Sequence, residues 1–212
     1  MVFCETARGE ESAGKPDVRP RIVAFGDSLT AGLGIPKEDA YPAQLQQRLD
    51  GLDIRYQVIN AGVSGDTTAG GVRRISLVLG MKPEIVILEL GANDGLRGLS
   101  LEQTRSNLIT MIEQLQQAGV TVILAGMKLP PNYGEDYTGG FEAIYPSLAK
   151  HYQLPLIPFF LAEVASLSAL NQADGIHPTK EGYRVVVEQV LKVLRPVISD
   201  RNRKTSGDRR SR

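Results

Sequence analysis

The sequence contains no tryptophan, one cysteine and two histidines among its 212 residues. A single cysteine, Cys4, cannot form a disulfide within the chain, so cysteine usage does not indicate a redox compartment. No group of histidines, cysteines and carboxylates has the spacing of a metal site, so we expect neither a metal nor another cofactor. No glycine-rich loop ending in Lys-Ser or Lys-Thr follows a strand-like segment, which disfavours a phosphate-loop nucleotide-binding protein.

Long hydrophobic runs are also missing. No apolar stretch approaches the ~20 residues that a membrane-spanning helix requires, so no transmembrane segment is expected. The first 20 residues lack the hydrophobic stretch of a signal peptide. Two locations therefore stay open: periplasmic or secreted if an export signal has been removed, and cytoplasmic otherwise.

Charge is balanced overall but unevenly spread. Residues 201–212 contain five arginines and one lysine against one aspartate, a net +5, so the preceding 200 residues carry −5 of a chain whose net charge is zero. A mildly acidic body argues against a nucleic-acid-binding face. We expect a flexible leader over residues 1–20, one domain over 21–198 and a basic disordered tail over 199–212. The oligomeric state stays open.

Short apolar runs alternate with amphipathic segments along the predicted domain. Strands are expected at residues 22–25, 58–59, 85–88, 120–125 and 156–157. Helices are expected at 42–52, from a cap at Asp66 to Gly80, from a capping box at Ser100 to Gly119, at 141–152, and from Pro178 onward, with Gly70 and Gly71 weakening the second. Alternating strands and helices predict an α/β fold, a parallel sheet covered on both faces.

Ser28 stands at the end of the first strand, in the turn Gly26-Asp27-Ser28. Ligands of open parallel sheets bind at the carboxyl ends of the strands, so this hydroxyl is placed where a nucleophile is useful. The alternative is a helix N-cap or turn serine, which is the commoner role of an isolated serine in such a turn. The other groups that the chain supplies favour the nucleophile.

A serine nucleophile needs a base, and His177 is the better of the two histidines. His151 lies in a predicted helix with nothing nearby to orient it, so we expect it at the surface. Asp174 precedes His177 by three residues across a glycine-containing turn, and Pro178 biases His177 toward extended backbone. The carboxylate can then hold Nδ1–H and leave Nε2 free for Ser28. The alternative is a local Asp turn with a capping histidine.

Two further loops offer donors for the oxyanion of a tetrahedral intermediate. Gly65 follows the second strand, where glycine permits close approach of its backbone N–H to a substrate. Asn93 follows the third strand and offers a side-chain amide. Together with the backbone N–H of Ser28, these groups predict an oxyanion hole, although each loop alone could be ordinary turn chemistry.

These residues resemble the four sequence blocks of the SGNH (GDSL) hydrolases, in order, over residues 21–198. The matching blocks are Gly26-Asp27-Ser28-Leu29, Gly65, Gly91-x-Asn93-Asp94 and Asp174-x-x-His177. Further stretches resemble the bacterial multifunctional thioesterase/lysophospholipase/arylesterase group; they are Val63-Ser64-Gly65-Asp66-Thr67, residues 89–98, Leu129-Pro130-Pro131-Asn132-Tyr133-Gly134 and Pro158-Phe159-Phe160.

The resemblance implies a single three-layer α/β/α domain of flavodoxin-like fold with a five-stranded parallel sheet. It implies a serine esterase that hydrolyses carboxylic esters and thioesters through an acyl-enzyme intermediate. Ser28, His177 and Asp174 would be catalytic, and Ser28, Gly65 and Asn93 would form the oxyanion hole. A small acyl ester, a thioester or a lysophospholipid is the expected substrate.

Residues near the predicted site suggest where a substrate would bind. We expect contacts from Asp27, Leu96, Leu129, Pro130 and Tyr133. Gly95 and Gly98 could act as hinges that close the intervening loop over an acyl chain. Two alternatives stay open: a carbohydrate O-acetyl esterase of the same fold, which the lack of tryptophan and the apolar loops disfavour, and a non-catalytic flavodoxin-like binding module.

Overall fold

The computed structural model describes residues 19–208, with side chains through Arg203. Five strands form one sheet: β1 (Arg21–Gly26), β2 (Gln57–Gly62), β3 (Ile85–Glu89), β4 (Thr121–Ala125) and β5 (Leu156–Ile157). Their order is β2-β1-β3-β4-β5, and every neighbouring pair is parallel. The predicted five-stranded parallel sheet is therefore confirmed. β3, apolar on both faces in the sequence, is buried along its whole length.

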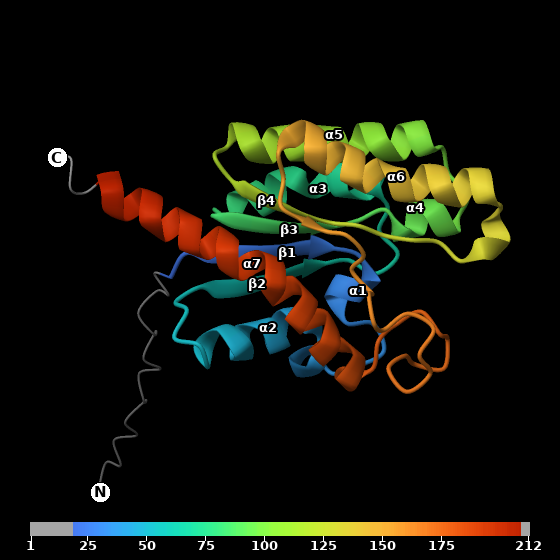
Figure 1. Ribbon diagram of the computed structural model, residues 1–212, viewed down its shortest axis with the longest axis horizontal. Helices are drawn as coiled ribbons and strands as arrows, with labels where there is room; N and C mark the ends of the chain where they lie inside the picture. The colour runs from blue at the N-terminus through green and yellow to red at the C-terminus, as the bar shows by residue number, and fades with distance from the viewer. Residues whose placement is uncertain (1–18, 209–212) are drawn as a thin grey trace, which may run out of the picture.

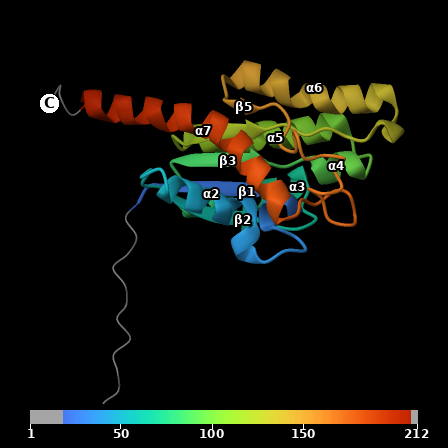
Figure 2. The ribbon, with the colours of Figure 1, turned by 60° about the horizontal axis from the view of Figure 1, so that its bottom comes forward.

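Helices cover the sheet on both faces. They are α1 (Ser28–Ala31), α2 (Tyr41–Asp50), α3 (Thr68–Gly80), α4 (Ala92–Leu96), α5 (Leu101–Gln117), α6 (Glu135–Tyr152) and α7 (Lys180–Asp208), with 3₁₀ turns η1 (Lys37–Asp39) and η2 (Pro131–Tyr133). α5 packs between α3 and α6 on one side, and α2 packs against α7 on the other (Figures 1 and 2). This is the predicted three-layer arrangement. The short helices α1 and α4 were not predicted, because one turn shows no periodicity.

Glycines at the ends of β1 and β2 let α1 sit close to the sheet. Gly26 lies opposite Gly62 on one side and Glu89 on the other. A Cβ on Gly26 would overlap the hydroxyl of Thr30 and the Glu89 side chain, and one on Gly62 would overlap the backbone of α1. Since no larger residue fits at either position, both strands end with their backbones directly against the residues around Ser28.

The start of α3 differs from the prediction. Thr67, not Asp66, is the N-cap, and its hydroxyl accepts a hydrogen bond from the N–H of Gly70. Helix α3 also runs straight through the two glycines. A Cβ on Gly70 would overlap the carboxylate of Asp66, and one on Gly71 would lie 2.5 Å from Leu90. The glycines therefore serve close packing and do not interrupt the helix.

The last helix continues past the predicted end of the domain at residue 198. α7 extends to Asp208, into the segment that we expect to be a disordered tail. Arg201 donates hydrogen bonds to the hydroxyl of Thr121, at 2.6 Å, and to Glu84, at 3.2 Å, which hold this part of α7 against the sheet. Residues 1–18 of the predicted leader and residues 209–212 lie outside the described part of the chain.

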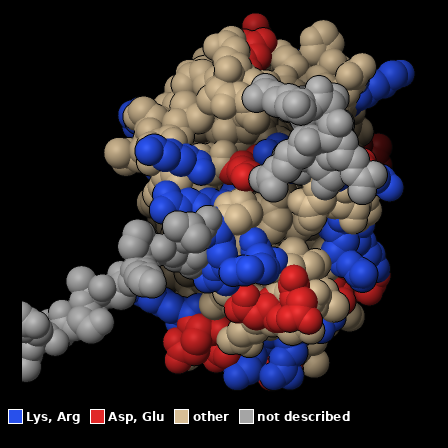
Figure 3. All heavy atoms as spheres, turned by 90° about the vertical axis from the view of Figure 1, so that its left-hand side faces the viewer, with Lys and Arg blue, Asp and Glu red and all other residues tan. Residues whose placement is uncertain are grey.

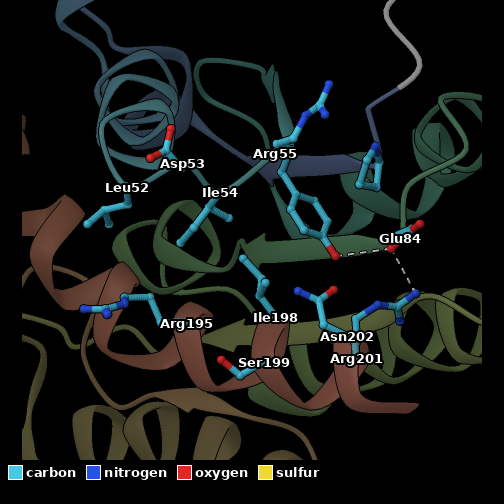
Figure 4. A pocket seen from close by; sticks show the side chains of 12 residues that line it. Leu52, Asp53, Ile54, Arg55, Glu84, Arg195, Ile198, Ser199, Arg201 and Asn202 are labelled. Atoms are coloured by element: carbon cyan, nitrogen blue, oxygen red, sulfur yellow. Dashed lines mark hydrogen bonds and ion pairs between the residues drawn. The ribbon is translucent and has the colours of Figure 1, made fainter. Parts of the chain in front are cut away.

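A cavity of about 860 Å³ opens at the amino ends of the strands, away from the predicted site. Pro20, Tyr56 and Glu84 line it together with the end of α7 (Figure 4). The same side of the molecule carries Lys and Arg interleaved with Asp and Glu (Figure 3). Between residues 19 and 208, no helix combines the length and the apolar composition that crossing a membrane would require.

Candidate active site

Ser28 is the first residue of α1. Asp27 is the N-cap, and its carboxylate accepts a hydrogen bond from the N–H of Leu29 at 3.0 Å. The alternative of a capping serine therefore does not hold. Ser28 is 9% exposed, and its Oγ lies 2.9 Å from Nε2 of His177, which is 149 residues further along the chain.

His177 is held by Asp174 through both backbone and side chain. Oδ2 of Asp174 lies 2.7 Å from Nδ1 of His177, while Oδ1 accepts hydrogen bonds from the N–H groups of Ile176 and His177. The backbone hydrogen bond from His177 is the main cause that lowers the pKa of Asp174 to about 2. An ionised Asp174 favours the Nδ1–H tautomer and leaves Nε2 as the acceptor that faces Ser28. The alternative predicted a local turn at Asp174, and this turn is present. Asp174 nevertheless also contacts the His177 ring, so the turn and the orienting contact occur together.

Gln172 connects the His177 loop to the segment after α1. Its side-chain amide donates to the carbonyls of Leu33, at 2.8 Å, and Pro178, at 3.1 Å. Its backbone N–H donates to the carbonyl of His177 at 2.7 Å. No local sequence pattern predicts this role of Gln172, because its contact with Leu33 joins positions 139 residues apart.

The donors predicted for an oxyanion lie on adjacent loops. Gly65 has a φ of +78°, a backbone conformation that favours glycine, and its carbonyl accepts a hydrogen bond from Arg97 at 2.9 Å. Within the described residues, the backbone N–H groups of Ser28 and Gly65 have no acceptor. Nδ2 of Asn93 donates to Oδ2 of Asp27 and to the carbonyl of Asp66, each at 3.0 Å. Asn93 thus links the loops that follow β1 and β2.

Asp94 fixes the loop that carries Asn93. Its carboxylate accepts hydrogen bonds from the N–H of Thr68, at 2.8 Å, and from the hydroxyl of the same residue, at 2.5 Å. Asp94 is buried, with only 2% of its surface exposed. The loop after β3 is therefore attached to the start of α3.

Two buried carboxyl groups lie next to Ser28. Asp27 and Glu89 have no exposed surface, and Oε2 of Glu89 accepts hydrogen bonds from the Thr30 hydroxyl, at 2.6 Å, and the Asp27 N–H, at 3.4 Å. Burial raises the pKa of Asp27 to about 6. Burial, assisted by the neighbouring Asp27 carboxylate, raises the pKa of Glu89 well above its usual range.

The position of the Asp27 carboxylate differs from the prediction. Asp27 is predicted to bind substrate, but its carboxylate contacts Leu29 and Asn93 in the interior. Glu89 is absent from the predicted site, although one signal was present: an acidic residue ends the apolar run Ile85–Leu88. His151, predicted to lie at the surface, is exposed.

The chain is similar in sequence and in fold to known proteins of one family. Residues 24–185 match the GDSL-like Lipase/Acylhydrolase family. The chain belongs to this family. The predicted SGNH (GDSL) membership and the predicted enzyme class, a hydrolase of acyl esters, are therefore confirmed.

Individual relatives cover most of the chain. Esterase TesA of Pseudomonas aeruginosa is 40% identical over 178 residues, 84% of this chain and 89% of that protein. An arylesterase of Vibrio mimicus is 38% identical over 92% of this chain and 94% of its own length. Thioesterase 1/protease 1/lysophospholipase L1 of Escherichia coli is 37% identical over 84% of this chain and 85% of its own length. A crystal structure of TesA, 40% identical, matches with a TM-score of 0.80 over 83% of this chain and 98% of that one.

In this GDSL-family chain, two of the residues predicted to contact substrate meet where α4 ends. The hydroxyl of Tyr133 donates to the carbonyl of Leu96 at 2.9 Å. Leu129 is half-buried, and Pro130 is exposed. The structure brings Leu96 and Tyr133 together at the end of α4, and their contact with substrate stays a prediction.

The predicted hinge at Gly95 is not supported. Gly95 is buried inside α4, and a Cβ there would lie 2.6 Å from Leu129 and 2.9 Å from Phe141. Glycine is therefore present because these side chains pack against it. Gly98 has a φ of +64° and open space around its Cβ position, so it is a turn glycine.

Proposed function

We propose that this chain is a serine esterase in which Ser28 is the nucleophile, His177 the base and Asp174 the residue that orients His177. One observation carries this proposal. At the carboxyl end of β1, Oγ of Ser28 lies 2.9 Å from Nε2 of His177, and Nδ1 of His177 lies 2.7 Å from Oδ2 of Asp174.

Catalysis proceeds in two acyl-transfer steps. Nε2 of His177 accepts the hydroxyl proton of Ser28 as Oγ attacks the acyl carbonyl, and it then gives this proton to the leaving alkoxide or thiolate. A water molecule attacks the acyl-enzyme in the same way: His177 takes one of its protons and returns it to Oγ as the acid product leaves. Asp174 remains ionised throughout and stabilises the imidazolium.

The oxyanion of each tetrahedral intermediate is stabilised by the N–H groups of Ser28 and Gly65 and by the Asn93 amide. The two backbone donors have no acceptor within the described residues. Both hydrogens of Asn93 Nδ2 already have acceptors, Asp27 and the Asp66 carbonyl. The oxyanion therefore shares or displaces one of these two contacts when it forms.

The substrate class follows from the relatives, whose names include esterase, arylesterase, thioesterase and lysophospholipase. We assign small acyl esters, acyl thioesters and lysophospholipids to this chain. Leu96, Leu129, Pro130 and Tyr133 supply the apolar and aromatic surface beside the Asn93 loop that such acyl groups require.

Covalent labelling tests this proposal directly. A fluorophosphonate probe is expected to modify Ser28 and to stop hydrolysis of p-nitrophenyl butyrate, a short acyl thioester and a lysophospholipid. Ser28→Ala should lose labelling and lose activity by several orders of magnitude while remaining folded. Ser76→Ala, at an exposed serine of α3, is the matched control and should behave as wild type. Retention of a tenth or more of the wild-type rate by Ser28→Ala would exclude this mechanism.

A further inference from the structure

Arg74 extends from α3 toward the carboxyl ends of β1 and β2. Its Nη2 donates to the carbonyl of Gly26 at 2.7 Å, and its Nη1 donates to the carbonyl of Ala61 at 2.6 Å. Its Nε donates to Oδ2 of Asp66 at 2.7 Å. The Arg74 side chain is only 16% exposed and that of Asp66 10%, so this ion pair is largely withdrawn from solvent.

Each acceptor belongs to a segment that carries a group of the proposed oxyanion hole. Gly26 is separated from Ser28 only by Asp27. Asp66 directly follows Gly65, and the Asp66 carbonyl accepts a hydrogen bond from Asn93 at 3.0 Å. A single guanidinium thus contacts the nucleophile strand and the Gly65 loop and, through Asp66, reaches Asn93.

The geometry of this contact requires arginine. A planar guanidinium can donate in three directions at once, whereas the ammonium of lysine is a compact charge that cannot span the same fork. The guanidinium also lies 4.4 Å from the centre of the Phe25 ring, a cation–π contact that fixes its plane. Gly70 leaves the space that the Asp66 carboxylate occupies, because a Cβ there would overlap it.

We propose that Arg74 is a positioning residue of the oxyanion hole: it holds the strand ends and Asp66 so that the donors from Ser28, Gly65 and Asn93 converge. This inference rests on the proposed function, because it assigns Arg74 to the same site. Arg74 does not touch the reacting atoms, so its effect reaches the reaction through donor placement. Small misplacements of catalytic groups lower the chemical step more than substrate binding.

The test compares Arg74→Lys, Arg74→Ala and the control Arg73→Ala, an exposed arginine one position earlier on α3. For the two Arg74 variants, kcat on p-nitrophenyl butyrate is expected to fall ~10- to 100-fold with KM nearly unchanged. The rate of Ser28 labelling by a fluorophosphonate should fall in parallel. Ethylguanidinium at a non-denaturing concentration should partly restore kcat of Arg74→Ala, and Arg73→Ala should match wild type.

Several outcomes would overturn the inference. One is a kcat within about threefold of wild type in folded Arg74→Lys, because the hole would then form without the guanidinium. Another is a kcat loss with an unchanged labelling rate, or no response of Arg74→Ala to ethylguanidinium. If Arg74→Ala fails to fold, the labelling rate and kcat of Arg74→Lys decide. Wild-type protein that is not labelled at Ser28 would instead refute the proposed function itself.

Discussion

The buried carboxyl group of Asp27 should make the stability of this protein depend on pH. Asp27 has no exposed surface, and burial is the main cause that raises its pKa from 3.8 to about 6. Hydrogen bonds from Leu29 and Asn93 oppose this rise but do not cancel it. The perturbation that tests this is Asp27→Asn, which removes the titration of Asp27 and keeps the size of its side chain.

The sign and size follow from the raised pKa. Between about pH 4 and pH 6 the folded protein keeps a proton on Asp27 that the unfolded chain has lost. The stabilisation from this proton is therefore complete below about pH 4 and is lost as the pH rises through about 6. A rise from 3.8 to about 6 corresponds to about 3 kcal/mol, at about 1.36 kcal/mol per pH unit.

Urea unfolding of wild type and of Asp27→Asn measures this effect. Circular dichroism follows the unfolding, because the chain has no tryptophan for fluorescence. The free energy of unfolding of wild type minus that of the variant should decrease by about 3 kcal/mol between about pH 3 and pH 7. Changed hydrogen bonding to Asn93 adds an offset to every point, and removal of the Asp27 charge lowers the raised pKa of Glu89, which adds to the decrease with pH. A difference that stays constant over this range, or that increases with pH, would show that Asp27 does not have a raised pKa.

Three other outcomes are expected. Asn93→Ala should lower kcat ~100- to 1000-fold with little change in KM, as measured by steady-state hydrolysis of p-nitrophenyl butyrate; a raised KM at constant kcat would show that Asn93 binds only the ground state. Gly95→Ala should lower the free energy of unfolding by ~1–3 kcal/mol, because its Cβ would meet Leu129 at 2.6 Å. The variant should also hydrolyse short and long acyl esters more slowly to the same extent, and faster turnover of long-chain esters alone would contradict this packing role. Within the described residues no three His, Cys, Asp or Glu side chains form a metal-binding group, so EDTA should leave the rate of ester hydrolysis unchanged. Loss of activity in EDTA that a divalent ion restores would contradict this.

The sequence allowed the fold and the Ser28–His177–Asp174 arrangement to be predicted because both depend on local patterns. Each strand after the first pairs with a strand whose apolar run was visible, and parallel strands bring their carboxyl ends to one edge. Ser28 and Asn93 follow directly after β1 and β3, so their proximity follows from topology. Asp174 and His177 are close in the chain, and a glycine turn suffices to join them.

Contacts between distant positions could not be predicted in this way. Arg74 is one of two arginines on an amphipathic helix, and only the packed structure shows that it reaches Gly26, 48 residues earlier. The sequence predicts Asp66 as the cap of α3 because aspartate is a strong cap. Asp66 is instead paired with Arg74, which leaves the capping hydrogen bond to Thr67.

Glu89 illustrates why the site departs from the hydropathy pattern of its strand. A leucine at this position would continue the apolar run of β3, but it would leave the Thr30 hydroxyl and the Asp27 N–H without the acceptor that Oε2 provides. Each buried donor left unsatisfied costs about 1–3 kcal/mol. Oε1 of Glu89 has no partner within the described residues, so the carboxyl group is costly to keep ionised and burial raises its pKa. The stability lost at this carboxyl group is offset by the two contacts that hold Asp27 and Thr30 on either side of Ser28.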